Sequence, residues 1–442
     1  MKLIYIVGLI FLFIYYSKKK EDFKSLRLCS KLKNIIEDKQ IILILGEQYW
    51  FDNEEDDIKE SKILLNFLKG INNYKVIISN HPVDFFKKLK HINKEKLKFV
   101  FLFQDIICDS YLNKMKINTV FNYLIKLRKD HNVIFYPGIE ETNYFSSKKY
   151  YQTLLNNMYY SVLPHTSVIE IKKFSKKDFL FLVRKIKYIC DNLIKKFEHV
   201  VIKKGYSYNS VQVAIIEKKI VNDIDKLAAE ILKLEKKDSF DIDGNALKWE
   251  TNIDRFYIIQ GYNEIVNEND LGEFRVFFID GKQKYVAWGD DYPNLCVDDI
   301  IKNDNFKYNS NDDDKTVRSL LNLNNSKSIE KLDPEISKEV VKFSKKVYDD
   351  FIKIFWKNKV KHPIIFRTDV SWAEDKHFQD KHSIYLKKSK KWIRLYVNEL
   401  EIDPTHFFYN NFLCKTNNLI KSAEIQTTVF NLILNYIEKH SK

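Results

Sequence analysis

The chain is poor in the residues that support several common architectures. Its 442 residues include only 10 Gly and 7 Pro, which excludes collagen-like proteins, glycine-rich linkers and proline-rich proteins. No period of roughly 20 to 50 residues repeats, so a solenoid or a propeller is not expected. Hydrophobic residues make up 45% and charged residues 30%, which is the balance of a globular protein. This length predicts about two or three domains with cores of their own.

Cysteine is also scarce. The five cysteines are far apart in the sequence, and no CxxC pair occurs; they are Cys29, Cys108, Cys190, Cys296 and Cys414. Such spacing indicates neither a disulfide framework nor a zinc site. We therefore expect a reducing compartment.

Several motifs of common active sites are missing. The sequence contains no GxxxxGK[ST] phosphate loop and no GxGxxG dinucleotide motif, and it contains neither GxSxG nor HExxH. These motifs serve nucleotide binding, acyl transfer and zinc-dependent hydrolysis. Any phosphate-binding function must therefore depend on lysines and on metal-binding carboxylates.

The positive charge is spread along the chain. Lys and Arg number 74 against 60 Asp and Glu, which gives a net charge of +14. Short lysine clusters at 18–20, 387–388 and 390–391 are scattered, whereas a nucleic-acid-binding face gathers its basic and aromatic residues on one stripe. We interpret the excess lysine as solvated surface and expect no nucleic-acid partner.

The longest apolar run opens the chain, at residues 3–16, and is followed by three lysines at 18–20. It is shorter than the ~20 residues of a comfortable membrane span, but interfacial tyrosines and snorkelling lysines extend its reach. The residues after it do not match a signal-peptide cleavage site. We predict an uncleaved membrane anchor at 1–17 and a basic linker at 18–39. The lysines after the run place the body in the cytoplasm.

Residues 40–138 predict a parallel α/β domain. Apolar runs typical of buried strands alternate with stretches of helical spacing, an order that indicates a parallel sheet with its own core. The expected strands are 40–46, 74–79, 98–103 and 132–136, and the expected helices are 58–71, 83–89 and 110–128. The pattern ends at Pro137-Gly138.

Two further domains of α+β type are expected at 139–260 and 261–442. The first is predicted to contain helices at 148–157, 176–197 and 224–234 and strands at 199–203, 211–216 and 257–260. The second is strand-rich from 273 to 288, has a helix that begins at Asp333-Pro334, and closes with a helix at 420–440. Its acidic triplet at 312–314 lies among polar residues and is interpreted as a loop.

Four segments of the sequence carry cations and carboxylates that could bind phosphate and a metal ion. They are Ser147-Lys148, the strand that ends at Lys203, the stretch from Gln260 to Glu273, and the pair Arg367-Thr368-Asp369 with Glu399-Leu400-Glu401. Glu399 and Glu401 are two apart on an expected strand and therefore share a face. Carboxylates suit magnesium, and the cations would offset phosphate charge. Taken singly, each residue is more simply a surface lysine or a solvent-facing strand residue.

Together these segments resemble the ATP-grasp superfamily, in the sense of D-alanine:D-alanine ligases, glutathione synthetase-like enzymes and ribosomal-protein glutamate ligase-like enzymes. The resemblance covers roughly residues 40–405. It implies an ATP-grasp fold with a pre-ATP-grasp domain at 40–138, a lysine-bearing middle domain at 139–260 and a carboxylate-bearing domain at 261–442. The set in this order is more specific than any one motif.

The resemblance also implies a role for each residue. Lys148 and Lys203 would contact ATP phosphate, Gln260, Gly261 and Tyr262 would meet the adenine, and Glu273 the ribose. Arg367 would bind phosphate and, with Lys203, act in catalysis. The metal ligands, for two Mg²⁺ ions, would be Asp369, Glu399 and Glu401. The chain departs from the family in a covering loop, 205–210, with a single glycine, in a longer hairpin through 375–391, and in Glu401, where Asn is common.

The implied function is an ATP- and Mg²⁺-dependent ligase that joins a carboxylate to an amine or thiol through an acyl phosphate. Two alternatives stay open. One is a kinase of the same fold that phosphorylates a hydroxyl, as in an inositol phosphate, which the basic loop 376–391 favours. The other is a catalytically inactive nucleotide-binding scaffold, which the glycine-poor loop favours. No motif indicates the small-molecule or peptide substrates or the oligomeric state.

Overall fold

The computed structural model describes the chain in segments, namely residues 39–45, 73–79, 82–103, 106, 117–156, 165–171, 176–205, 213–236, 239–240, 246–247, 255–262, 273–288, 295–296, 334–355, 363–375, 382–402 and 431–440. Among these residues, none of the helices combines the length and the apolar character needed to cross a bilayer. The predicted anchor and the linker up to residue 38 lie outside the described residues. So do the predicted helix at 58–71 and the acidic triplet at 312–314.

The first sheet is parallel, as predicted. Its strands are β1 (Gln40–Leu45), β2 (Tyr74–Ser79), β3 (Leu97–Leu102) and β4 (Ile134–Tyr136), in the order β2-β1-β3-β4. Helices α3 (Pro82–His91) and α4 (Ile117–His131) cover one face, where they meet Leu43 and Leu45 of β1. The strands are continuously apolar because both faces of the sheet are covered.

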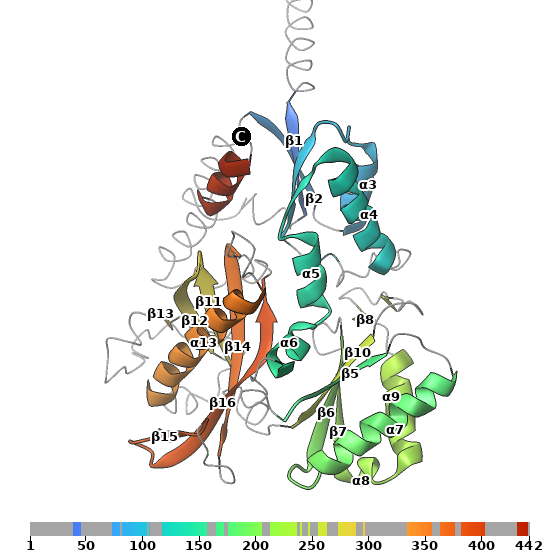
Figure 1. Ribbon diagram of the computed structural model, residues 1–442, viewed down its shortest axis with the longest axis vertical. Coiled ribbons are helices and arrows are strands. Elements are labelled where there is room, and N and C mark those ends of the chain that lie inside the picture. Colours follow the sequence, from blue (N-terminus) through green and yellow to red (C-terminus); the bar gives the residue numbers. More distant parts are fainter. Residues whose placement is uncertain are drawn as a thin grey trace, which may run out of the picture.

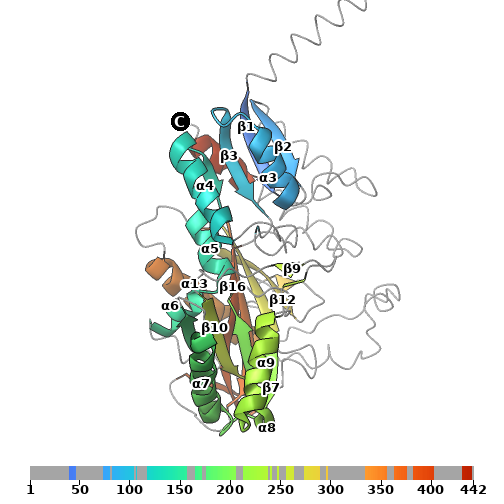
Figure 2. The same ribbon diagram turned by 90° about the vertical axis from the view of Figure 1, so that its right-hand side faces the viewer.

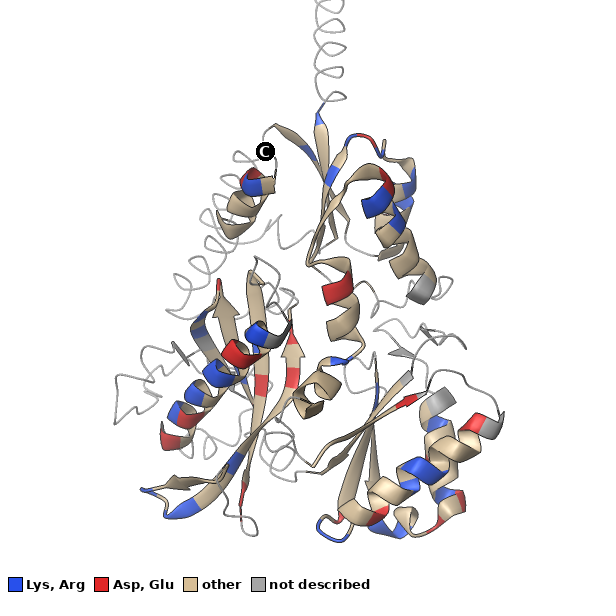
Figure 3. Cartoon of the chain, viewed as in Figure 1, with Lys and Arg blue, Asp and Glu red and all other residues tan. Residues whose placement is uncertain are grey.

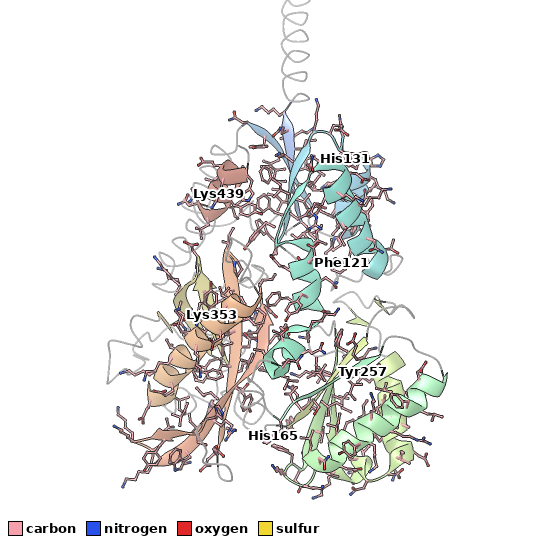
Figure 4. All side chains as sticks on the ribbon, in the orientation of Figure 1. Phe121, His131, His165, Tyr257, Lys353 and Lys439 are labelled. Atoms are coloured by element: carbon pink, nitrogen blue, oxygen red, sulfur yellow. The ribbon has the colours of Figure 1, made fainter. Side chains whose placement is uncertain are left out.

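The second sheet is antiparallel and is called the lysine sheet below. It has the order β5-β10-β6-β7, with β5 (Ser167–Ile171), β6 (His199–Lys204), β7 (Val213–Glu217) and β10 (Arg255–Gly261). Helices α7 (Lys176–Leu193), α8 (Lys218–Val221) and α9 (Ile224–Lys236) contribute to the core on one face, which includes Tyr257 (Figure 4). Strand β5 was not predicted, because five residues that follow an expected turn carry little periodicity.

The third sheet is the largest and is called the carboxylate sheet below. Its order is β13-β12-β11-β14-β16-β15 and its pairs are antiparallel. The strands are β11 (Glu273–Ile279), β12 (Lys282–Trp288), β13 (Leu295–Cys296), β14 (Ile365–Glu374), β15 (Ile384–Leu386) and β16 (Lys391–Glu401). The pairing of β14 with β16 confirms the predicted long hairpin. A separate two-stranded ribbon joins β8 (Ser239–Phe240) to β9 (Ala246–Leu247).

One face of the carboxylate sheet is covered by helices from two parts of the chain. Helix α13 (Pro334–Phe355) shares an apolar core with α5 (Ile139–Ser146) and α6 (Tyr150–Asn156), through residues such as Tyr150 and Phe351. The segment that leaves the parallel sheet at residue 136 therefore passes to the carboxylate sheet before the chain enters the lysine sheet. Figure 1 shows the parallel sheet at the top and the other two sheets below it.

A second apolar core joins the parallel sheet to the carboxylate sheet. The face of the parallel sheet opposite α3 and α4 contributes Phe101, which packs in one cluster with Phe277 of β11 and Ile433 of the helix at 431–440. The Tyr136 hydroxyl accepts a hydrogen bond of 2.7 Å from the backbone N–H of Ile364. Figure 2 shows the same arrangement from the side, with the parallel sheet at one end of the molecule and α7 and α9 at the other. Parallel and antiparallel sheets together are the α/β and α+β architecture expected from the sequence.

Candidate functional site

Strand β16 carries a β-bulge at Asn398. Asp369 of β14 pairs with Glu399, but the next residue, Val370, pairs with Val397. Asn398 is therefore the extra residue that has no partner in the ladder.

The bulge changes which side chains face the core. Before the bulge, the odd-numbered residues of β16 lie in the core that α13 covers, namely Ile393, Leu395 and Val397. After the bulge, the even-numbered residues Leu400 and Ile402 lie in that core. Side chains alternate along a strand, so Asn398, Glu399 and Glu401 all project from the opposite face. A regular strand would have turned either Asn398 or Glu399 into the core.

The neighbouring strands present charged residues to the same face. On β14, Phe366 and Val370 lie in the core, and Arg367 and Asp369 alternate with them. On β11 the core residues are Phe274, Val276 and Phe278; Glu273 directly precedes them and Arg275 lies between the first two, so both face the opposite side. Figure 3 shows the acidic positions as bands on the central strands of the sheet.

Arg367 is the centre of a buried ion cluster. Its guanidinium binds the Asp369 carboxylate with two hydrogen bonds, Nε to Oδ1 at 2.7 Å and Nη2 to Oδ2 at 2.8 Å. Its Nη1 lies 2.9 Å from Oε2 of Glu401. The Arg367 and Asp369 side chains are only 4% and 2% exposed. Such two-point pairing holds both groups in a fixed orientation.

Burial and charge act in opposite directions on this pair. Burial lowers the pKa of the Arg367 guanidinium, but the carboxylates of Asp369 and Glu401 outweigh it and raise that pKa above its ordinary value. Burial raises the pKa of the Asp369 carboxyl, and the Arg367 guanidinium opposes this.

Lys148 reaches the site from the turn between α5 and α6. Its φ is 59°, in the left-handed region that side chains with a Cβ seldom adopt. The Lys148 ammonium forms an ion pair with Glu399 and is 11% exposed. Burial lowers the pKa of Lys148, but the Glu399 carboxylate raises it above its ordinary value overall. The helix predicted at 148–157 begins at Tyr150 instead, because the turn needs Lys148 in this conformation.

Lys203 reaches the site from the lysine sheet. On β6, Val200 and Ile202 belong to the core beneath α7 and α9, so Lys203 projects to the other side. Its Nζ donates a 3.1 Å hydrogen bond to Oδ1 of Asn398. Burial, together with the neighbouring charge of Lys148, lowers the pKa of Lys203 to about 8.

Asn398 connects the predicted residues to one another, and sequence reasoning missed it. Its Nδ2 donates to the Glu273 carboxylate, its Oδ1 accepts from Lys203, and its backbone carbonyl accepts from the Tyr151 hydroxyl. The only signal in the sequence is its position directly before Glu399. The bulge that turns it toward the site has no mark in the sequence.

The three residues predicted to meet the adenine lie along the end of β10. The Gln260 side chain is buried, and its Nε2 donates a 2.9 Å hydrogen bond to the Thr166 hydroxyl. Gly261 is required by Phe197, since a Cβ at Gly261 would lie 2.5 Å from the phenyl ring. The backbone N–H of Tyr262 donates to the His199 carbonyl at 3.1 Å. The Gln260 side chain forms a hydrogen bond with Tyr151, which places it next to the site. Gly261 and Tyr262 pack instead against Phe197 and His199.

The three predicted metal ligands share a face but do not converge on one point. Within the described residues, no group of three acidic, histidine or cysteine side chains is placed to hold an ion. Asp369 and Glu401 contact Arg367, and Glu399 contacts Lys148. Mg²⁺ in proteins is usually bound by one or two carboxylates together with substrate phosphates. These oxygen donors therefore fit an ion that arrives with a nucleotide, and not a cage built by the protein alone.

Comparisons with known proteins complete the description. No family model and no curated protein matches the sequence. The chain resembles the D-alanine–D-alanine ligase of Bacillus anthracis with 15% identity and a TM-score of 0.40, over 91% of this chain and 100% of that one. A RimK domain ATP-grasp protein of Sphaerobacter thermophilus is similar with 7% identity and a TM-score of 0.40, over 89% of this chain and 99% of that one. The D-cycloserine synthetase DcsG is similar with 10% identity and a TM-score of 0.41, over 88% of this chain and 99% of that one.

Proposed function

We propose that this chain binds ATP with Mg²⁺ where the lysine sheet faces the carboxylate sheet, and that it is a ligase. The observation that carries the proposal is the meeting of Lys148 and Lys203 with the acidic face of β14 and β16. Lys148 and Glu399 are separated by 251 positions in the sequence and form an ion pair. Lys148 comes from the turn between α5 and α6, Lys203 from the lysine sheet and the carboxylates from the carboxylate sheet, and charged residues gathered in this way at one buried place are typical of a functional site.

The cations are suited to a triphosphate. Lys148, Lys203 and Arg367 each already have an acidic or amide partner, so their positions are set before a ligand binds. Phosphate oxygens would replace those partners on Lys148 and Lys203. Mg²⁺, when bound, would neutralise phosphate charge next to the Glu399 carboxylate that Lys148 releases. Glu273 and the end of β10 are proposed to hold the nucleoside.

The proposed reaction has two steps. An oxygen of the substrate carboxylate attacks the γ-phosphorus of ATP, the bond from that phosphorus to the β-γ bridging oxygen breaks, and ADP leaves. The resulting acyl phosphate is then attacked at its carbonyl carbon by an amine or thiol, and inorganic phosphate leaves while the nucleophile loses its proton. Lys203 and Arg367 stabilise the charge on the transferring phosphoryl group. The chain itself supplies no nucleophile.

One observation favours a second candidate, a nucleotide-binding module without turnover. Every predicted metal ligand is paired with a cation, and such pairs have to open before an ion enters. The kinase alternative depends on the basic loop at 376–391, of which residues 376–381 lie outside the described residues, and it stays a prediction.

Thermal unfolding with and without Mg–ATP tests the nucleotide site. At 100 times its dissociation constant a ligand adds about 2.7 kcal/mol to the free energy of unfolding. We expect Asp369→Asn with Glu399→Gln to abolish the dependence on magnesium. Glu374→Gln, the same change on an exposed carboxylate of β14, is the matched control and should keep it. A wild-type chain that Mg–ATP does not stabilise would exclude the site.

Product analysis separates the three functions. The chain is incubated with Mg–ATP and pooled amino acids, peptides and inositol phosphates, and the products are identified by mass spectrometry. A ligase yields ADP, inorganic phosphate and a condensed product. A kinase yields ADP and a phosphorylated hydroxyl without free phosphate, and stabilisation without any product identifies the inactive module.

A further inference from the structure

The β-bulge of β16 is bound by a tyrosine that has no role in the proposed function. Asn398 has no partner in the ladder of β14 and β16, so its backbone carbonyl needs a donor from elsewhere. That donor is the Tyr151 hydroxyl of α6. Tyr151 is only 1% exposed, and burial raises the pKa of its hydroxyl well above the ordinary value. The hydroxyl therefore stays protonated and able to donate.

This hydrogen bond favours the bulge over a regular strand. The carbonyl that Tyr151 binds belongs to the peptide group between Asn398 and Glu399, so the bond fixes the orientation of that group. In a regular strand the same carbonyl would be directed at a neighbouring strand. Asn398 or Glu399 would then face the core, because side chains alternate along a strand. The Tyr151 hydroxyl thus helps to decide on which face the Glu399 carboxylate lies.

One short segment binds the bulge at two points. Lys148 lies just before α6 and forms an ion pair with Glu399, and Tyr151 lies in the first turn of α6 and binds Asn398. The Tyr151 ring stacks on Tyr150, with ring centroids 4.8 Å apart, and both rings belong to the core of the carboxylate sheet. Packing therefore sets the position of the hydroxyl before any ligand binds.

The lysine sheet is attached to the same hydroxyl. The Gln260 side chain of β10 forms a hydrogen bond with Tyr151, and its Nε2 also donates to the Thr166 hydroxyl at 2.9 Å. Figure 1 shows α6 between β16 and β10. Tyr151 therefore joins both sheets to the bulge.

We propose that Tyr151 is a positioning residue, whose hydroxyl stabilises the bulge and thereby directs the Glu399 carboxylate toward the Mg²⁺–nucleotide site. The proposal rests on the proposed function, in which Glu399 is a metal ligand. Tyr151 acts only through the backbone next to Glu399. Loss of the hydroxyl would leave a buried carbonyl without a donor, which weakens the bulge.

Calorimetric titration of Mg–ATP into the full chain tests the role. Tyr151→Phe keeps the ring and should lower the affinity about tenfold. Tyr257→Phe is the matched control: the Tyr257 hydroxyl is also buried, and in the described part of the chain it forms no hydrogen bond. This variant should change the affinity less than about twofold. In a Glu399→Gln chain, adding Tyr151→Phe should lower the affinity less than about twofold further, because both changes act through one residue.

Hydrogen exchange of the backbone amides at 391–401 tests the bulge without a ligand. Exchange should be at least about fivefold faster in Tyr151→Phe and unchanged in Tyr257→Phe. Unchanged exchange in Tyr151→Phe overturns the proposal, as does a further tenfold loss of affinity in the Glu399→Gln chain.

The two proposals fail in different ways. If the wild-type chain binds Mg–ATP and Tyr151→Phe binds it equally well, Tyr151 has no positioning role and the nucleotide site stands. If the wild-type chain does not bind Mg–ATP, the nucleotide site fails, and with it the role of Tyr151 toward a metal ligand.

Discussion

The molecule has two lysine-rich regions that are built in opposite ways. At the junction of the lysine sheet and the carboxylate sheet, every cation contacts a carboxylate or an amide: Lys148 binds Glu399, Lys203 binds Asn398, and Arg367 binds Asp369. At the amino ends of the parallel strands, Lys39, Lys75, Lys88 and Lys96 line one cavity and are exposed or half-buried, and Lys88 pairs there with Asp84 at 2.6 Å. Burial explains the difference, since buried charge is unfavourable without a partner and exposed lysines keep their hydration.

This difference predicts two kinds of response to substitution. Removing a cation from the junction leaves a buried carboxylate without its partner and costs stability as well as ligand affinity. Removing an exposed lysine such as Lys75 leaves stability almost unchanged.

Arg367→Leu is expected to have the largest effect. It leaves Asp369 and Glu401 without their shared cation, and breaking a buried pair in this way costs about 3–5 kcal/mol of unfolding free energy. Arg394→Leu is the matched control, because Arg394 pairs with the buried Asp375 on the same sheet at 3.1 Å. Both variants should be destabilised in denaturant unfolding, but only Arg367→Leu should lose Mg–ATP binding. Retained binding would contradict the role proposed for Arg367.

Lys148→Met should lower Mg–ATP affinity at least tenfold and cost about 1–3 kcal/mol, because Glu399 loses its partner. The neighbouring lysine provides the control. Lys149 lies 5.2 Å from the centre of the Phe256 ring, and Lys149→Met should cost less than about 1 kcal/mol. Titration of ATP against each variant by calorimetry gives the affinities; equal losses would show that position 148 has no special role.

Gly205→Ala probes the close approach between the lysine sheet and the Lys148 turn. A Cβ at Gly205 would lie 2.8 Å from the Ser147 carbonyl oxygen, so the turn would have to move. We expect a cost of about 1–3 kcal/mol together with weaker Mg–ATP binding. At Gly138 the three atoms nearest to a Cβ all belong to the flexible Glu141 side chain, the closest at 3.2 Å, and Gly138→Ala should be tolerated. Unchanged ATP affinity in Gly205→Ala would show that the turn adapts.

Lys203 predicts a pH dependence of nucleotide binding. Its pKa in the folded chain is about 8, and the protonated amine is the form that attracts phosphate. Affinity should therefore be constant below pH 8 and fall above it, by up to about tenfold per pH unit. Lys203→Arg keeps its charge throughout this range, so the decline should disappear. A decline of the same size in Lys203→Arg would assign it to another group.

Stability linked to the same amine has the opposite sign. The folded pKa is below the ordinary value of 10.5, so the unfolded chain binds more protons between pH 8 and 10.5. This group alone makes the free energy of unfolding rise with pH over that range.

The smallest effect is expected at the amino ends of the parallel strands. Lys75 is exposed at the start of β2, and Lys75→Ala should change the free energy of unfolding by less than about 0.5 kcal/mol. Urea unfolding of Lys75→Ala and of Lys148→Met, measured side by side, compares the free energies of unfolding that the two regions contribute. A cost as large as that of Lys148→Met would show that Lys75 has a structural role.

Local patterns in the sequence were sufficient for most elements. The strand predicted at 74–79 has the bounds of β2, and the strands and helices expected at 83–103 and 224–234 are present within a few residues. These segments follow one periodicity, so hydrophobic spacing alone defines them. Strand β5 and helix α5 were missed. Both are short and lie next to turns, where periodicity carries little information.

The candidate site was only partly predictable. The charged residues and their order were visible, and the shared face of Glu399 and Glu401 followed from strand geometry. The left-handed Lys148, the bulge at Asn398 and the ion pairs that occupy the predicted metal ligands were not visible. Each of these depends on contact with a distant strand or helix.

By itself, the sequence determined the parallel sheet, the kinds of secondary structure and the list of charged groups, because period, propensity and residue chemistry act over a few neighbouring positions. The tertiary structure alone decided which of those charges meet. Lys148 and Glu399 are paired by the packing of α5 and α6 on the carboxylate sheet, and Lys203 reaches them because β6 turns its other face to a core of its own. Burial then selects the partners, since a charge removed from water must find its counter-charge inside the fold.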